Sequence, residues 1–214
     1  MFGALYVVAD LDEYYIDPEA YLANYPLEIP DELLKFNRPR TEWAFDDLAA
    51  SVQELSQGRD FAHARQTFQV ANCIACHKLN DVGIEMGPDL SKLDEKLQSM
   101  EILRELLEPS LKINEKYYSY TFLLESWAVV SGLIIEETDD VVKVVENPLA
   151  QAEPRILNVN EIQERQRSNV SIMPKGLLDK LTRDEILDLI AYVTARGRED
   201  HPLFHGGDHH AAGH

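Results

Sequence analysis

Residues 73–77 have the sequence Cys73-Ile74-Ala75-Cys76-His77, and this spacing is the attachment signature of c-type haem. Two thiols one turn apart can add to the two vinyl groups along one edge of the porphyrin. The next residue, His77, then lies beneath the ring with its imidazole aimed at the iron. Cys73 and Cys76 are the only cysteines in the chain. The motif therefore predicts one covalently attached haem c whose proximal iron ligand is His77.

Other uses of paired cysteines fit this chain less well. Half a structural zinc site needs two more soft ligands, and the sequence has no third cysteine. A thioredoxin-like redox pair belongs in a β-α-β unit, and no parallel strand pattern follows the motif. A disulfide across so short a loop would constrain little of the unfolded chain. Haem attachment is therefore the favoured interpretation.

A second segment, Gly87-Pro88-Asp89-Leu90, begins ten residues after His77. It resembles a segment of class I cytochromes c in which the proline carbonyl accepts the Nδ1 proton of the proximal imidazole. Such a bond fixes the ring and makes it a better donor to the metal. The resemblance therefore assigns the backbone of Pro88 to the support of His77, with an ordinary Gly-Pro turn as the alternative.

Methionine is the expected ligand on the opposite face of the iron. Met173 stands in a turn shortly before the predicted last helix, and it is the favoured sixth ligand. Met86 is close to His77 in sequence and reaches the opposite face with difficulty, and Met100 fits the core side of an amphipathic helix. His63 or a tail histidine, Met86, or a vacant position are the alternatives. A neutral thioether favours Fe(II) and raises the reduction potential.

Composition restricts the partners. The 214 residues include 20 Lys and Arg against 38 Asp and Glu, a formal net charge of −18. This charge argues against nucleic acid, which is approached through its phosphates. No apolar run approaches the roughly 18 residues that a membrane-spanning helix needs. We expect a redox partner protein with a basic patch.

The chain divides into three parts. Residues 1–40 are an acidic, proline-containing, extended lead-in, residues 41–196 one domain, and residues 197–214 a tail rich in His and Gly. A flexible tail is favoured over a divalent metal site, because ordering glycine-rich ligands is costly. The first ten residues lack the features of a secretory signal.

Periodicity predicts a mainly α fold with a small antiparallel β module. Helices are expected over 41–57, 60–70, 91–107 (as two short helices) and 182–197, where Thr182 and Glu185 form a capping box. The β module covers about 117–159, between the Gly-Pro segment and Met173. Its strands are 117–124, 129–136 and 140–146, with 155–159 as a possible fourth. One helix contact is expected to contain Phe61, Phe68, Ile186, Leu189 and Tyr192.

Several segments together resemble a known family. The sequence is similar to the haem-binding cytochrome c domain of planctomycete-type dehydrogenases, which is typically fused behind a sugar- or PQQ-type dehydrogenase β-propeller. The most specific motifs are C-x-x-C-H and S-x-M-P-x-G-L, and the matching stretches are 40–43, 45–46, 58–61, 72–77, 87–90, 105–110, 171–178 and 188–192.

The resemblance implies a class I cytochrome c-like helical fold with a β insert, and a fused or associated dehydrogenase. Residues 3–10 then look like the last strand of a propeller blade, with an N-terminal strand of this chain alone as the alternative. The chain departs from the family at one hairpin, where it has Ser126-Trp127 in place of the frequent Asp-Gly.

Together these observations predict a single-haem c-type cytochrome that carries one electron between a dehydrogenase or other donor and a respiratory acceptor. It would be an electron-transfer protein or domain and not itself an enzyme. One alternative is a five-coordinate haem sensor or peroxidase-like protein. Another is that residues 117–159 are a docking module for another protein and that the haem only stabilises the fold. Covalent haem attachment predicts a periplasmic or extracytoplasmic location.

Overall fold

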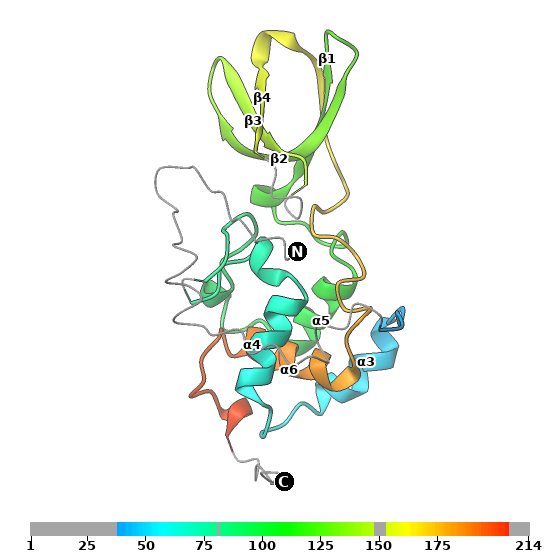
Figure 1. The fold of residues 1–214 in the computed structure, drawn as a ribbon, viewed down its shortest axis with the longest axis vertical. Coiled ribbons are helices and arrows are strands. Elements are labelled where there is room, and N and C mark those ends of the chain that lie inside the picture. The colour runs from blue at the N-terminus through cyan, green and yellow to red at the C-terminus, as the bar shows by residue number, and fades with distance from the viewer. Residues whose placement is uncertain (1–37, 81, 148–152, 206–214) are drawn as a thin grey trace, which may run out of the picture.

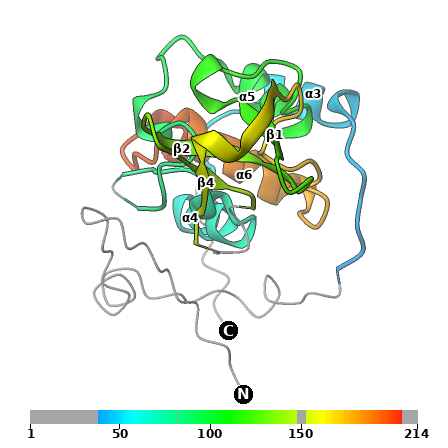
Figure 2. The same cartoon turned by 90° about the horizontal axis from the view of Figure 1, so that it is seen from above.

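The computed structural model describes residues 38–80, 82–147 and 153–205. Helices gather at one end of the molecule and a curved β-sheet stands at the other (Figure 1). Seen from above, the strands lie over the helical body (Figure 2). The helices of the described part are α3 (Phe45–Gln53), α4 (Phe61–Val70), α5 (Ser99–Leu107) and α6 (Arg183–Thr194).

The predicted mainly α, class I cytochrome c-like fold is wrong. The described part of the chain combines four helices with a five-stranded antiparallel sheet, and 34% of residues are helical and 20% are in strands. The sheet is larger than predicted because a further strand, β5 (Ile162–Arg167), follows the four expected ones. Its sequence Ile-Gln-Glu-Arg-Gln-Arg has no apolar alternation, so periodicity could not reveal it.

The four expected strands are confirmed, as β1 (Ser119–Leu124), β2 (Val129–Glu137), β3 (Val141–Val145) and β4 (Arg155–Asn158). They pair in the order β4-β3-β2-β1-β5, so the first and fifth strands are neighbours. The sheet encloses a core of its own, made of Phe122, Leu124, Val130, Val142, Val144 and Leu157. This separate core shows that the β module is a folded unit within the chain and not a loop on the helical body.

The two ends of the β module are fastened together beside the helices. The backbone N–H of Ser168 donates to the carbonyl of Ser119 at 2.9 Å, and the Ser119 hydroxyl donates to the carbonyl of Val170 at 3.2 Å. The N–H of Ser171 also donates to Oγ of Ser110 at 3.0 Å. These bonds hold the segment that carries Met173 next to the segment that leaves α5.

The helical body is packed by the predicted contact between α4 and α6. The ring of Tyr192 lies 5.4 Å from that of Phe61 and 5.6 Å from that of Phe68, both in edge-on geometry. Ile186 and Leu189 are fully buried in the same core. The prediction that these residues form helix packing is confirmed.

Hydrogen bonds explain where α3 and α6 begin. The Thr182 hydroxyl accepts from the N–H of Glu185 at 3.3 Å, and the Glu185 carboxylate accepts from the N–H of Thr182 at 2.6 Å, so the predicted capping box is confirmed. Among the described residues, the first helix, α3, begins at Phe45 and not at the predicted Thr41. The reason is that the backbone N–H of Thr41 donates to the carbonyl of Asp179 at 2.7 Å, which holds this residue in an extended segment.

The first part of the predicted tail lies against α4. Phe204 is buried, and its ring centroid lies 5.1 Å from that of Phe61. Residues 206–214, which include three of the tail histidines, and all but the last three residues of the predicted 1–40 lead-in lie outside the described residues. Among the described residues, no helix is long and apolar enough to cross a bilayer.

A buried carboxylate joins α4 to α6. Asp188 accepts from Nδ1 of His63 at 2.7 Å and lies 3.1 Å from Nε of Arg59. The hydrogen bond to Asp188 raises the pKa of His63 above its usual value, and desolvation opposes the shift. Because the folded pKa is raised, this stabilisation is complete below the unfolded pKa near 6.5 and is lost as pH rises through the folded pKa.

We therefore expect His63→Ala to reduce the free energy of unfolding more at pH 5.5 than at pH 8.5. The difference between the two reductions is about 1 kcal/mol, a modest value because the imidazole is partly exposed to solvent. Denaturant titrations of the wild type and the variant at both pH values measure it. Equal reductions at both pH values would contradict the assigned role of the Asp188 pair.

Candidate functional site

The Cys-x-x-Cys-His motif forms a tight turn directly after α4. Asn72 takes a left-handed conformation with φ of 60°, which ends the helix, and Cys73–Ala75 form a single 3-10 turn, η1. The backbone N–H of His77 donates to the carbonyl of Cys73 at 2.9 Å. This compact turn places Cys73, Cys76 and His77 in the lining of one cavity.

The imidazole of His77 has the second partner that metal-ligating histidines require. Its Nδ1 lies 3.0 Å from the carbonyl oxygen of Pro88. A carbonyl only accepts, so Nδ1 carries the proton and the lone pair of the neutral ring is on Nε2. Burial lowers the pKa of His77, and the hydrogen bond to Pro88 opposes that shift. The ring is thus held neutral, in the tautomer that can bind iron through Nε2.

Gly87 lets the supporting loop approach this ring. A Cβ added at position 87 would lie 2.7 Å from Cε1 and 2.9 Å from Nδ1 of His77. The backbone N–H of Gly87 also donates to the carbonyl of Cys76 at 2.6 Å. Position 87 therefore has no room for a side chain while His77 keeps its orientation.

We expect Gly87→Ala to displace the His77 ring from Pro88 and to destabilise the protein by about 1–3 kcal/mol. Loss of the Nδ1 hydrogen bond also weakens the imidazole as a donor, so in protein that carries haem the iron potential should change as well. Denaturant titration measures the stability, and spectroelectrochemical titration measures the potential. An unchanged stability together with an unchanged potential would show that the loop does not position the ring.

The cavity has a volume of about 420 Å³. This size is in the range of small-molecule and cofactor sites, which are roughly 300–1,000 Å³. Its walls come from α4, α5, α6 and the segments between them, and they are mainly apolar: Phe68, Leu90, Leu93, Leu97, Ile102, Leu106, Ile113, Ile172, Leu177, Leu189 and Val193. An apolar cavity with two thiols and one oriented imidazole fits a flat hydrophobic macrocycle better than a polar substrate.

Met173 and Met86 both line this cavity, and they come from two different segments of the chain. The backbone N–H of Met86 donates to the carbonyl of Cys76 at 3.1 Å, so Met86 is tied to the motif itself. Met173 comes from the loop that follows the sheet, where its N–H donates to Oγ of Ser171 at 3.2 Å. Met173 therefore reaches the cavity from a segment separate from the one that carries His77.

The remaining candidates for the sixth position lie elsewhere. Met100 is packed against the helical core and is not part of the cavity lining. His63 is held by Asp188 and does not line the cavity either. Within residues 38–80, 82–147 and 153–205, His77 is the only imidazole in the lining. Tail residues His209, His210 and His214 lie outside this range.

Both thiols are protonated at neutral pH. Burial raises the pKa of Cys73 to about 12 and that of Cys76 to about 11. Redox-active and metal-binding cysteines have lowered pKa values instead. In the part of the chain that the structure describes, no group of three or more His, Cys, Asp or Glu side chains could hold a metal ion. Zinc binding and thiol redox chemistry therefore gain no support.

Sequence analysis missed the polar residues at the cavity. Glu105 on α5 and Lys112, Asn114 and Tyr117 on the segment before β1 all contribute to its lining. Desolvation raises the pKa of Glu105, and nearby Lys112 opposes the shift. Glu105 lies in the stretch 105–110 that resembles the family, but no motif marks Lys112, Asn114 or Tyr117.

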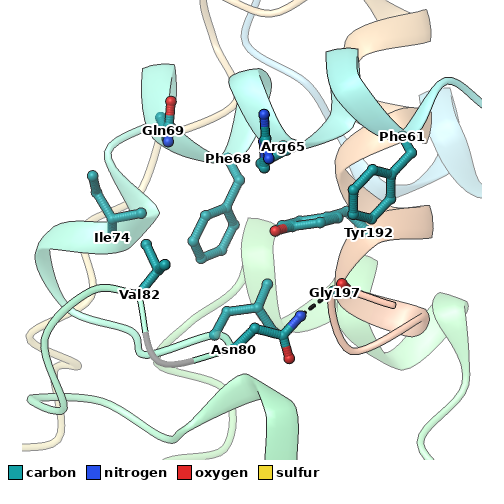
Figure 3. Close-up of a pocket in the computed structure, with 10 residues that line it drawn as sticks. Phe61, Arg65, Phe68, Gln69, Ile74, Asn80, Val82, Tyr192 and Gly197 are labelled. Carbon is teal, nitrogen blue, oxygen red and sulfur yellow. Dashed lines mark hydrogen bonds between the residues drawn. The ribbon is translucent and has the colours of Figure 1, made fainter. Parts of the chain in front are cut away.

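Figure 3 shows a second, smaller pocket of about 160 Å³, and Phe68 lines both this pocket and the larger cavity. Its walls include Phe61 and Tyr192, and Nδ2 of Asn80 donates to the carbonyl of Gly197 at 2.6 Å. This bond fastens the loop after the Cys-x-x-Cys-His motif to the end of α6. The small pocket thus belongs to the packing that supports the motif.

No protein-family model matches this chain, and no curated protein matches it.

Proposed function

We propose that this protein is a single-haem c-type cytochrome that carries one electron between a donor, such as a dehydrogenase, and a respiratory acceptor. One observation carries the proposal: a single apolar cavity has Cys73, Cys76, His77 and Met173 in its lining. The same cavity contains Pro88, whose carbonyl orients His77. Haem c, when bound at these residues, supplies a one-electron change between Fe(III) and Fe(II).

Each residue of the set has a distinct task. Cys73 and Cys76 would hold the haem as thioethers: each S–H would add across one vinyl C=C bond, giving one C–S and one C–H bond with no external oxidant. His77 would bind the iron through Nε2, since the Pro88 carbonyl accepts the proton of Nδ1. Met173, which lines the same cavity, would supply a neutral thioether ligand.

The alternative of a five-coordinate sensor or peroxidase-like protein gains no support from His63. Such a site needs a polar acid-base residue near the iron. His63, the candidate from the sequence, is hydrogen-bonded to Asp188 and does not line the cavity. Six-coordinate iron with a methionine ligand suits electron transfer, so the electron-transfer proposal is preferred.

Absorption spectra of both oxidation states, with a haemochrome assay, test the proposal. The protein should be produced in cells that attach haem c, and the expected result is one haem per chain, low-spin iron and reversible one-electron reduction. Rapid binding of carbon monoxide to the reduced protein would favour the five-coordinate alternative. A colourless product from such cells would overturn the proposal.

The acidic charge predicts the electrostatics of electron exchange. With a formal net charge of −18, we expect reduction by the cation hexaammineruthenium(II) to slow by roughly tenfold between low salt and about 0.5 M salt. Reduction by an anion such as dithionite should accelerate over the same range. Stopped-flow absorbance at a haem band measures both. Rates that do not depend on ionic strength would contradict a partner selected through a basic patch.

A further inference from the structure

The hairpin between β1 and β2 ends in a turn that carries an unusual residue. The N–H of Trp127 donates to the carbonyl of Leu124 at 2.8 Å, and the N–H of Leu124 donates to the carbonyl of Ala128 at 2.9 Å. Trp127 has φ of 64°, in the left-handed region. A tight turn followed by one left-handed residue is a common hairpin loop, and glycine is the residue that suits its last position.

Tryptophan reduces the stability of the folded protein at this position, and burial of its side chain does not compensate. A left-handed conformation disfavours a bulky L-residue by roughly 1–2 kcal/mol relative to glycine. The side chain is also not buried in return, because Trp127 is 77% exposed. No packing of the sheet therefore explains why the turn has tryptophan where glycine would be more stable.

One exposed apolar residue and three exposed acidic residues lie near Trp127 in the chain or in the strand pairing. Val129, which starts β2, is 61% exposed. The N–H of Glu125 donates to the carbonyl of Glu161 at 2.8 Å, so these two exposed acidic residues lie next to one another beside the turn. Glu164 lies opposite Leu123 in the register of β1 and β5. The turn lies at the end of the sheet away from the helices (Figure 1).

We propose that the turn around Trp127 is a docking surface for a protein partner that has an apolar pocket rimmed by lysine or arginine. Tryptophan is enriched among the few residues that dominate binding energy at interfaces. The acidic rim, Glu125, Glu161 and Glu164, complements such a partner and disfavours an anionic membrane surface. This surface is separate from the haem cavity, so it attaches the cytochrome to a partner without covering the iron site.

The glycine variant separates binding from folding. Trp127→Gly should leave the stability of the protein unchanged or raise it, because glycine suits the left-handed position. The same variant should keep the haem spectrum of the wild type and should weaken the partner complex by about 30-fold or more. Leu111→Ser is the matched control, since Leu111 is 65% exposed but lies outside the hairpin.

The probe is a set of extracytoplasmic proteins from the source organism, passed over immobilised full-length wild type and Trp127→Gly protein. Each protein that only the wild type retains is identified, purified and titrated against both by calorimetry. The expected result is a partner with a basic pocket, a complex that weakens with salt, and a further loss of affinity on Glu125→Lys with Glu161→Lys, which leaves the turn intact.

Several results would overturn the inference. One is that the wild type and Trp127→Gly retain the same proteins with equal affinity. Another is that Trp127→Gly unfolds the sheet, which would make the indole structural. Dimerisation that depends on Trp127 in sedimentation equilibrium would identify a second copy of the chain as the occupant. Trp127-dependent binding to phosphatidylcholine vesicles would identify a membrane. The haem spectrum of each variant reports separately on the proposed function.

Discussion

The variant Cys73→Ala with Cys76→Ala is expected to lose all covalently bound haem. Both sulfur atoms line the cavity, and no other cysteine exists in the chain to replace them. The wild type should hold one haem that survives denaturation and acid extraction, whereas the double variant should hold none. Each single variant should keep one thioether bond. Its haemochrome band should lie at a wavelength between that of haem with two thioether bonds and that of haem with none.

Thiol titration of the denatured protein checks the same prediction independently. Wild-type protein with attached haem should show no free thiol, because both sulfur atoms are thioethers. Protein made without haem attachment should show two thiols that react only after unfolding, since burial raises the pKa of both. Two free thiols in the coloured protein would contradict covalent attachment.

Replacement of Met173 by alanine is expected to have the second large effect, on the iron potential. Loss of the thioether should lower the reduction potential on the order of 100 mV, within the roughly 0.8 V range that axial ligands cover. The vacated position should also bind carbon monoxide rapidly. Spectroelectrochemical titration measures the potential, and stopped-flow mixing measures the ligand binding.

Met86→Ala is the matched control because both methionines line the cavity. The backbone of Met86 is bonded to Cys76, next to His77, so its thioether is expected to stay on the histidine side. Its removal should leave the potential and the spin state nearly unchanged. If Met86→Ala lowers the potential and Met173→Ala does not, the assignment of the sixth ligand is reversed.

Local patterns predicted those parts of the molecule that neighbouring residues specify. The spacing from Cys73 to His77 predicted which side chains share a site, because a tight turn after a helix allows few arrangements of them. Thr182 and Glu185 predicted the start of α6 for the same reason, since a capping box needs only residues three apart. The resemblance of the Gly-Pro segment also led to the Pro88 carbonyl, which lies 3.0 Å from Nδ1 of His77.

Long-range pairing accounts for what was missed. β5 is polar at nearly every position, and it becomes a strand because it pairs with β1 across more than 30 intervening residues. That pairing also invalidated the mainly α class, which had been inferred from the helical periods and the family resemblance. Lys112, Asn114 and Tyr117 line the cavity together with residues of α4 and α6, which lie far from them in the chain.

Residue identity and spacing alone specify the paired thiols, the adjacent imidazole, the downstream methionine and the large negative charge. The mixed α and β architecture, the shape and walls of the cavity, and the exposure of Trp127 at a left-handed turn arise in the folded chain. These features depend on contacts between residues far apart in the chain, and local periodicity carries no information about such contacts.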